Sequence, residues 1–131
     1  MRESIRVAAV NVDSKPGETA RNLERIAEWA DRAAAEGVDI ALFPELSLTG
    51  FIPNHPVGDH AAWMREAVKQ ARRLAEPING NAVTAFVEMA VSRQIHLSAG
   101  LLEDAGNLLY NTQVLAAPDG IVPIDDHGQR L

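Results

Sequence analysis

The chain has 131 residues, of which 47% are hydrophobic and 23% are charged, as is typical of one folded domain. Its net charge of −6 and its two lysines argue against a nucleic-acid partner, because phosphate binding needs clustered basic side chains. The absence of cysteine excludes disulfides, thiolate metal sites and a cysteine nucleophile within these residues.

The hydrophobic segments are short. No apolar run approaches the roughly 20 residues that cross a bilayer. The apolar stretch near the N-terminus is interrupted at Asn11, too soon for a signal peptide. We therefore expect no membrane partner and a cytoplasmic location.

The first 43 residues predict a strand, a helix and a second strand. Residues 5–12 are apolar without strict alternation, which indicates a strand buried on both faces. Residues 18–36 repeat apolar side chains at intervals of three and four, and Gly37 supplies a stop. Residues 39–43 resume strand character until Pro44. Two strands joined by a long helix are expected to be parallel, with ligands bound beyond their carboxyl ends.

The remainder predicts a loop, two helices and further strands. Residues 49–60 contain two prolines and two glycines, which indicate an ordered loop. Helical spacing follows over 61–74 and 79–94, and residues 95–103 predict a strand. Residues 108–124 have the form of a strand, a Pro-Asp-Gly turn and another strand, which predicts a hairpin.

Glu45 is the first candidate for chemistry, because it follows the second predicted strand and Pro44 directly. A carboxylate beside apolar neighbours loses hydration, and such a group is suited to take up a proton as a general base. The alternative is a solvated loop glutamate that happens to follow a strand.

Two other groups of polar residues have alternative interpretations. His55, Asp59 and His60 carry metal-binding side chains, but their spacing matches no helical pair, so a surface loop is preferred and no metal is expected. Tyr110 and Asn111 begin a predicted strand. They would either pack and cap there or bind a substrate, to which the Asn111 amide would hydrogen-bond.

The serines lack the context of a nucleophile. Ser47, Ser92 and Ser98 do not lie in a G-x-S-x-G sequence, and no glycine-rich phosphate loop is present. His96 lies within a predicted strand and is expected to be a hydrogen-bonded structural residue.

Three stretches, "FPELSLTGF", "AGLLED" and "LLYNTQVLAAPDG", together resemble the N-terminal half of the carbon-nitrogen hydrolase, or nitrilase, superfamily. The resemblance covers roughly residues 5–122. It implies an α/β fold, the α-β-β-α sandwich of the nitrilase type, of which this chain would be the incomplete N-terminal half. It also implies assembly into dimers and cleavage of non-peptide C–N bonds in small amides, carbamoyl compounds or nitriles. The implied reaction passes through a cysteine thioester without a cofactor.

The resemblance assigns catalysis to a glutamate, a lysine and a cysteine. Glu45 matches the glutamate, which acts as the general base. His127 falls about where the lysine is expected, and it is not a credible replacement. The cysteine would lie beyond Leu131. The chain alone is therefore expected to be inactive.

Residues 1–131 are interpreted as one partial domain, with an atypical tail at 123–131. So abrupt a departure is the expected signature of a frameshift, a premature stop or a truncated gene model. The chain is then part of a hydrolase or, alternatively, a non-catalytic module that pairs with a partner chain or with itself. Half of a sandwich exposes an apolar sheet face and an unpaired edge, which favours such association. A third possibility is metal binding through His55 and His60.

Overall fold

The computed structural model describes residues 3–52, 58–120 and 122. These residues contain one four-stranded sheet of order β1-β2-β3-β4. The strands are β1 (Val7–Ala9), β2 (Ile40–Leu42), β3 (His96–Asp104) and β4 (Leu109–Ala116). The first three are parallel and β4 runs antiparallel to β3, so the parallel pairing predicted for the first two strands is confirmed.

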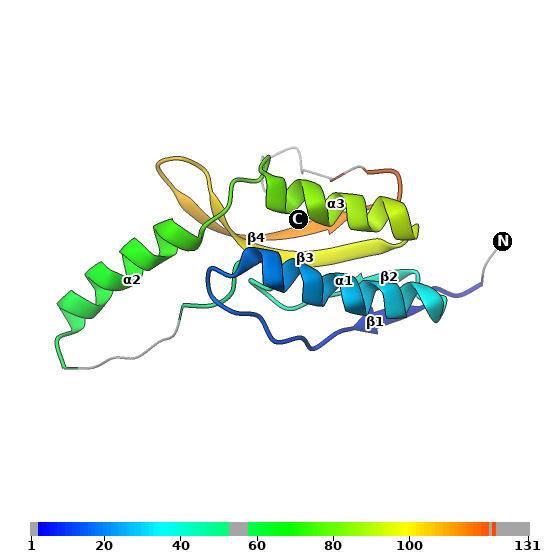
Figure 1. Ribbon diagram of the computed structural model, residues 1–131, viewed down its shortest axis with the longest axis horizontal. Helices are drawn as coiled ribbons and strands as arrows, with labels where there is room; N and C mark the ends of the chain where they lie inside the picture. The colour runs from blue at the N-terminus through cyan, green and yellow to red at the C-terminus, as the bar shows by residue number, and fades with distance from the viewer. Residues whose placement is uncertain (1–2, 53–57, 121, 123–131) are drawn as a thin grey trace.

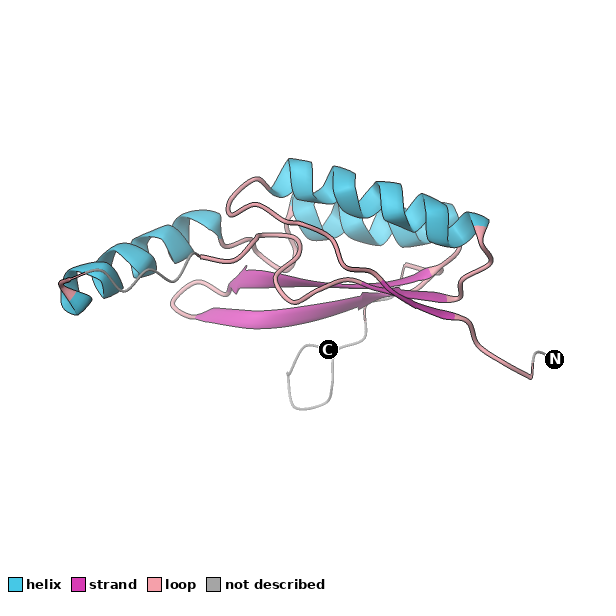
Figure 2. Cartoon of the chain, turned by 90° about the horizontal axis from the view of Figure 1, so that it is seen from below, coloured by secondary structure: helices cyan, strands magenta, loops and turns pink. Residues whose placement is uncertain are grey.

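The helices are α1 (Thr19–Ala35), α2 (His60–Leu74) and α3 (Asn81–Arg93). α1 and α3 lie together on one face of the sheet, whereas the other face carries no helix of the described residues (Figure 2). α2 extends away from these layers (Figure 1). The described residues thus form an α layer on a β layer, which is part of the sandwich that the sequence predicts. None of their helices is both long enough and apolar enough to cross a membrane.

The hydrophobic core lies between the two helices and the sheet. Ile26 of α1 and Phe86 of α3 are fully buried there. Burying a side chain of this size contributes about 1.5–3 kcal/mol relative to leaving it exposed. The spacing of the buried positions follows the helical repeat, which explains why these two segments were recognisable as helices. Core residues contributed by the strands are Ala41, Leu97, Ala99, Leu101, Val114 and Ala116.

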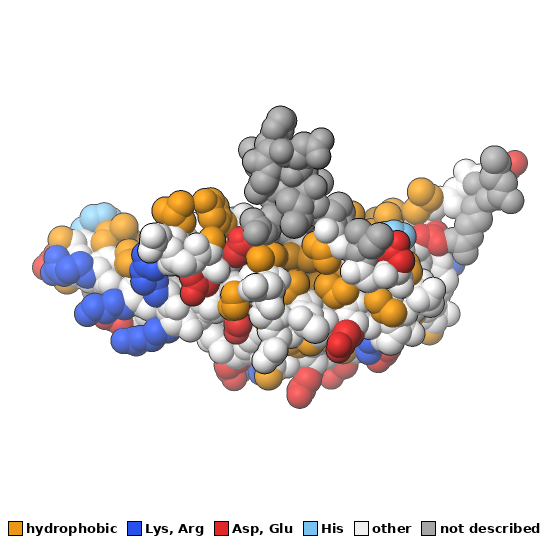
Figure 3. All heavy atoms as spheres, turned by 90° about the horizontal axis from the view of Figure 1, so that it is seen from above, with side chains coloured by type: hydrophobic (Ala, Val, Ile, Leu, Met, Phe, Trp, Pro, Cys, Tyr) orange, Lys and Arg blue, Asp and Glu red, His pale blue; other side chains and the backbone are white. Residues whose placement is uncertain are grey.

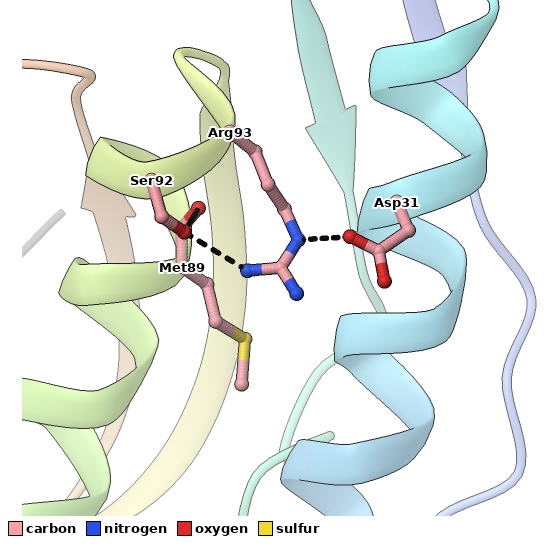
Figure 4. A network of polar contacts seen from close by, with 4 residues as sticks. All are labelled: Asp31, Met89, Ser92 and Arg93. Atoms are coloured by element: carbon pink, nitrogen blue, oxygen red, sulfur yellow. Dashed lines mark hydrogen bonds and ion pairs between the residues drawn. The ribbon is translucent and has the colours of Figure 1, made fainter.

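An ion pair joins the two packed helices. Nε of Arg93, at the end of α3, lies 2.6 Å from Oδ1 of Asp31 in α1 (Figure 4). The same guanidinium donates a hydrogen bond from Nη1 to Oγ of Ser92, at 3.2 Å. Arg93 is therefore held in place by its own helix while it contacts α1.

The first strand differs from the prediction for residues 5–12. β1 has only three residues, and its side chains at Val7 and Ala9 are exposed. Burial on both faces was wrong, because β1 is the edge of the sheet and only one face is covered by helices.

The hairpin also differs from the prediction. The structure forms it between β3 and β4, where the amide of Ala105 donates to the carbonyl of Leu108 at 3.0 Å. The predicted Pro-Asp-Gly turn is present, with the amide of Gly120 donating to the carbonyl of Ala117 at 2.9 Å. The strand expected after it, at 121–124, lies almost entirely outside the described residues.

Candidate functional site

Glu45 lies in a turn just beyond the carboxyl end of β2. The chain leaves the strand with the amide of Phe43 still donating to the carbonyl of Ser98, at 2.8 Å. Residues 45–49 then form the turn. Leu46 has a φ of +53°, in the left-handed region that costs a non-glycine residue about 1–3 kcal/mol. Such a conformation persists only where the surroundings hold it.

Strand β3 holds this turn through backbone and side-chain hydrogen bonds. The amide of Leu48 donates to the carbonyl of Gly100 at 2.8 Å. The amide of Leu102 donates to Oγ1 of Thr49 at 2.9 Å, and the amide of Gly100 donates to Oγ of Ser47 at 3.4 Å. The turn therefore continues along the edge of β3 where β2 ends, and the hydroxyl groups of Ser47 and Thr49 are structural.

Gly100 allows the turn to approach the strand. A Cβ at this position would lie 2.4 Å from the backbone nitrogen of Leu46 and 2.9 Å from Oε1 of Gln113. The first distance is to backbone, which cannot move aside without moving the turn. The absence of a side chain at Gly100 thus sets the place of Glu45 against the sheet.

Asn22 of α1 fastens the turn from the other side. Its side chain is 1% exposed. Oδ1 accepts a hydrogen bond from the amide of Lys15 at 2.8 Å, and Nδ2 donates to the carbonyls of Lys15 and Leu48 at 2.9 and 3.0 Å. Both polar atoms of the buried amide are hydrogen-bonded, and these bonds link α1 to the turn that carries Glu45.

The carboxylate of Glu45 is exposed and meets β4. Nδ2 of Asn111 donates a hydrogen bond to Oε1 of Glu45. The expected apolar surroundings of Glu45 are therefore not found, because the side chain extends over the helix-free face of the sheet toward a polar amide. Gln113, two residues along on the same face, donates to Oγ of Ser98 at 2.9 Å. Together these four residues form a polar strip on that face.

Tyr110 does not share this arrangement. Side chains alternate between faces along a strand, so Tyr110 projects to the face of the buried Thr112 and Val114, opposite to Asn111. The structure brings Asn111 to Glu45 and leaves Tyr110 on the other side, 47% exposed.

The residues considered as metal ligands fall in separate roles. Oδ1 of Asp59 accepts from the amide of Ala62 at 3.1 Å and caps α2. His60 is the first residue of that helix and packs against Trp63, with ring centroids 5.6 Å apart. His55 lies outside the described residues, as does His127. Within the described ranges no three such side chains gather to hold a metal ion.

Comparison with known proteins decides the family. Residues 6–130 match the family described as carbon-nitrogen hydrolase. The chain belongs to that family. It is 26% identical over 117 residues to an (R)-stereoselective amidase from Pseudomonas sp., covering 89% of this chain and 37% of the amidase. It is 26% identical over 120 residues to an aliphatic nitrilase from Sinorhizobium fredii, covering 88% of this chain and 39% of the nitrilase.

The fold agrees with this assignment. A carbon-nitrogen hydrolase superfamily protein from Xanthomonas campestris superimposes with a TM-score of 0.69 at 18% identity, over 91% of this chain and 38% of that protein. The chain thus spans less than half the length of the family members that it matches, and its α and β layers correspond to part of their fold.

Three residues of the site were not singled out from the sequence. Gly100 sits inside a strand, where a glycine can mark a close backbone approach, so this signal was available. Asn22 and Gln113 gave no signal, because a single polar residue in an amphipathic pattern does not reveal what it will meet after folding.

Proposed function

We propose that Glu45 is the general base of a carbon-nitrogen hydrolase site that cleaves small amides, carbamoyl compounds or nitriles. The catalytic lysine and cysteine are missing from these 131 residues, which have a histidine near the lysine position and contain no cysteine, and a longer product would supply them. Residues 1–131 act as one partial domain of that enzyme, and alone they are inactive. The proposal keeps the cytoplasmic location that the sequence suggests.

The observation that carries this proposal is the placement of Glu45. The turn that carries it is fixed to β3 and α1 at Leu48, and its carboxylate stands beyond the end of a parallel strand, where open α/β sheets bind ligands. Oε1 accepts from Asn111, whereas no described residue donates to Oε2. Oε1 is thus held by a hydrogen bond, and Oε2 is available to accept a proton.

The proposed chemistry uses Glu45 to transfer protons in both halves of the reaction. Glu45 takes the proton of the cysteine thiol, and the thiolate forms a bond to the substrate carbon. The leaving nitrogen of an amide departs with a proton, which Glu45 is placed to return. Glu45 then removes a proton from water, whose oxygen displaces the thiolate from the thioester and releases the carboxylic acid, and the proton returns from Glu45 to the thiolate. A positioned base of this kind accelerates the reaction about 10²–10⁴-fold.

Asn111 orients the base in this proposal. A carboxylamide that donates to one carboxylate oxygen fixes the direction of the other, and misplacement of a catalytic group by about 1 Å can cost about a hundredfold in rate. Tyr110 remains a second predicted substrate contact, although the fold separates it from Glu45.

The test uses a longer protein in which the family pattern, with its lysine and cysteine, replaces the tail 123–131 and continues beyond it. It is obtained from a coding frame that continues the family pattern, or by appending the corresponding segment of the amidase relative. We expect hydrolysis of small amides, and loss of turnover in Glu45→Gln with an unchanged circular dichroism spectrum. Glu18→Gln removes an exposed carboxylate elsewhere and serves as the control. Full turnover in Glu45→Gln would refute the role of Glu45.

A non-catalytic assembly module is the second candidate. The helix-free sheet face exposes Val7 by 55% and Leu42 by 41%, and β1 is an open edge. Apolar faces and free edges of this kind favour association with a partner chain or a second copy. A chain that stays monomeric by light scattering from micromolar to millimolar concentration would count against this function.

A further inference from the structure

Gln113 of β4 is a partly buried polar residue on the helix-free face of the sheet. It lies two residues after Asn111, and side chains that are two apart on a strand point to the same face. Its partner in β3 is Gly100, which has no side chain to cover the strand at this point. The carboxamide of Gln113 therefore lies directly over the backbone of β3.

The space over Gly100 is shared between Gln113 and the turn that carries Glu45. A Cβ on Gly100 would lie 2.9 Å from Oε1 of Gln113. The same point lies 3.1 Å from the carbonyl carbon of Glu45 and 2.4 Å from the nitrogen of Leu46. The carboxamide of Gln113 thus lies against the peptide group that joins Glu45 to Leu46. The orientation of that peptide group sets the direction in which the side chain of Glu45 leaves the backbone.

Ser98 holds the carboxamide of Gln113 in this place. Nε2 of Gln113 donates a hydrogen bond to Oγ of Ser98 at 2.9 Å. Ser98 is 7% exposed, and its carbonyl accepts from the amide of Phe43 at 2.8 Å, where the chain leaves β2 for the turn. The contacts therefore close a ring, because Ser98 joins β2 to Gln113 and Gln113 lies against the turn that follows β2.

Packing alone does not require a polar pair at this place. The neighbours of Ser98 on the two adjacent strands are Leu42 and Leu115, and both are apolar. Basic side chains, which would explain a carboxamide as their acceptor, gather mainly at the end that α2 forms (Figure 3). The group that Gln113 does meet is the backbone of the proposed base.

We propose that Gln113 is a positioning residue of the hydrolase site. Held by Ser98, its carboxamide fixes the Glu45–Leu46 peptide group and thereby directs the carboxylate of Glu45. This inference rests on the proposed role of Glu45 as the general base. Asn111 holds the carboxylate itself, and Gln113 supports the backbone from which that carboxylate extends. A catalytic group needs such support, because misplacement by about 1 Å can cost about a hundredfold in rate.

The first test measures amide turnover in the longer protein with Gln113→Met. Methionine keeps the length and approximate volume of glutamine but donates no hydrogen bond to Ser98. We expect kcat to fall about 10–100-fold with KM nearly unchanged, because the base is misaligned while substrate binding is not altered. Leu115→Met is the control, since it places the same side chain on the same face two residues further along β4, and it should leave kcat unchanged. Circular dichroism shows whether each variant folds.

A double-mutant cycle with Ser98 tests the mechanism. Ser98→Ala should lower kcat as much as Gln113→Met does, and the two together should lower it no further, because the residues act as one unit. Additive losses, a loss confined to KM, or full kcat in Gln113→Met would overturn the positioning role. Where Gln113→Met fails to fold, full kcat in Ser98→Ala overturns it equally.

The 131-residue chain supplies a measurement that needs no turnover. The amide NMR shifts of Glu45 and Leu46 should change in Gln113→Met and not in Leu115→Met, and unchanged shifts in both variants would overturn the inferred contact. The outcomes also separate the two proposals. Full kcat in Gln113→Met beside an inactive Glu45→Gln rejects the role of Gln113 alone. Turnover that survives in Glu45→Gln rejects the general base, and with it the positioning of that base.

Discussion

At the scale of single residues, the position of Glu45 depends on neighbours that carry no charge. Gly100 leaves the space into which the Glu45–Leu46 peptide fits, and the buried amide of Asn22 ties the following turn to α1. The turn keeps Leu46 at a positive φ only because both attachments exist.

Gly100→Ala should destabilise the fold by about 1–3 kcal/mol, because the new methyl group meets backbone that must shift. Urea unfolding gives the free energy, and amide NMR shifts should change at Leu48 and Thr49. Gly106→Ala is the control, since a Cβ there meets nothing within 4 Å and only the φ of +84° is affected. Shifts at Leu48 that are equal in both variants would contradict this role for Gly100.

Asn22→Ala should lower the free energy of unfolding by about 2–4 kcal/mol, because it removes three hydrogen bonds and leaves buried backbone groups without partners. Asn107→Ala, in the exposed β3–β4 turn, is the matched control and should change stability by no more than about 0.5 kcal/mol. Thermal and urea denaturation measure the stability of both variants. Similar losses of stability in the two would refute the role of Asn22 in linking α1 to the turn.

Asn111→Ala should slow amide turnover of the longer protein by about 10–100-fold without unfolding it, because Glu45 loses the donor that orients it. Steady-state kinetics should place the loss in kcat more than in KM. A loss confined to KM would instead assign Asn111 to substrate binding.

The sequence singled out Glu45 as a candidate base, and this role stays a prediction; it did not reveal the residues that support Glu45. A carboxylate directly after a strand and a proline can be seen in the sequence alone, and the resemblance to the hydrolase family implies the role that we propose for it. The partner Asn111 was noted as a substrate contact, because nothing in the sequence shows that β4 pairs with β3 within reach of the turn that follows β2.

At the scale of elements, periodicity predicted the helices well and the sheet less well. α1 and α3 bury one face each, so the helical repeat was clear. The length and exposure of β1 depend on its place at the sheet edge, which is a tertiary property. The Pro-Asp-Gly sequence predicted the hairpin at the wrong connection. The observed hairpin turns at Gly106–Asn107, between β3 and β4.

The α1–α3 ion pair should contribute at most about 1 kcal/mol, because the side chain of Asp31 is 64% exposed. A double-mutant cycle with Asp31→Asn and Arg93→Gln measures the coupling, which should fade at about 1 M salt. The exposed pair of Arg32 and Glu36, at the end of α1, provides the comparison, with an expected coupling of about 0.3–0.5 kcal/mol. A coupling of several kcal/mol at high salt would show that the contact is not electrostatic.

At the scale of the whole molecule, the chain provides one sheet with one helical layer and spans 37% of its amidase relative. A general base can be in place in such a part while the nucleophile is not. We expect no hydrolysis of amides by the isolated chain above the uncatalysed rate, measured as released ammonia. Hydrolysis that survives in Glu45→Gln of the isolated chain would point to a contaminating enzyme.

The most direct test of the central claim is single-turnover acylation of the cysteine in the longer protein, followed by mass spectrometry. If Glu45 removes the thiol proton, the unchanged protein forms the thioester adduct, and Glu45→Gln forms it at least about a hundredfold more slowly. Glu45→Asp, which keeps a carboxylate, should recover part of the rate. An acylation rate in Glu45→Gln within about tenfold of the unchanged protein would contradict the account, because the base would then be another group.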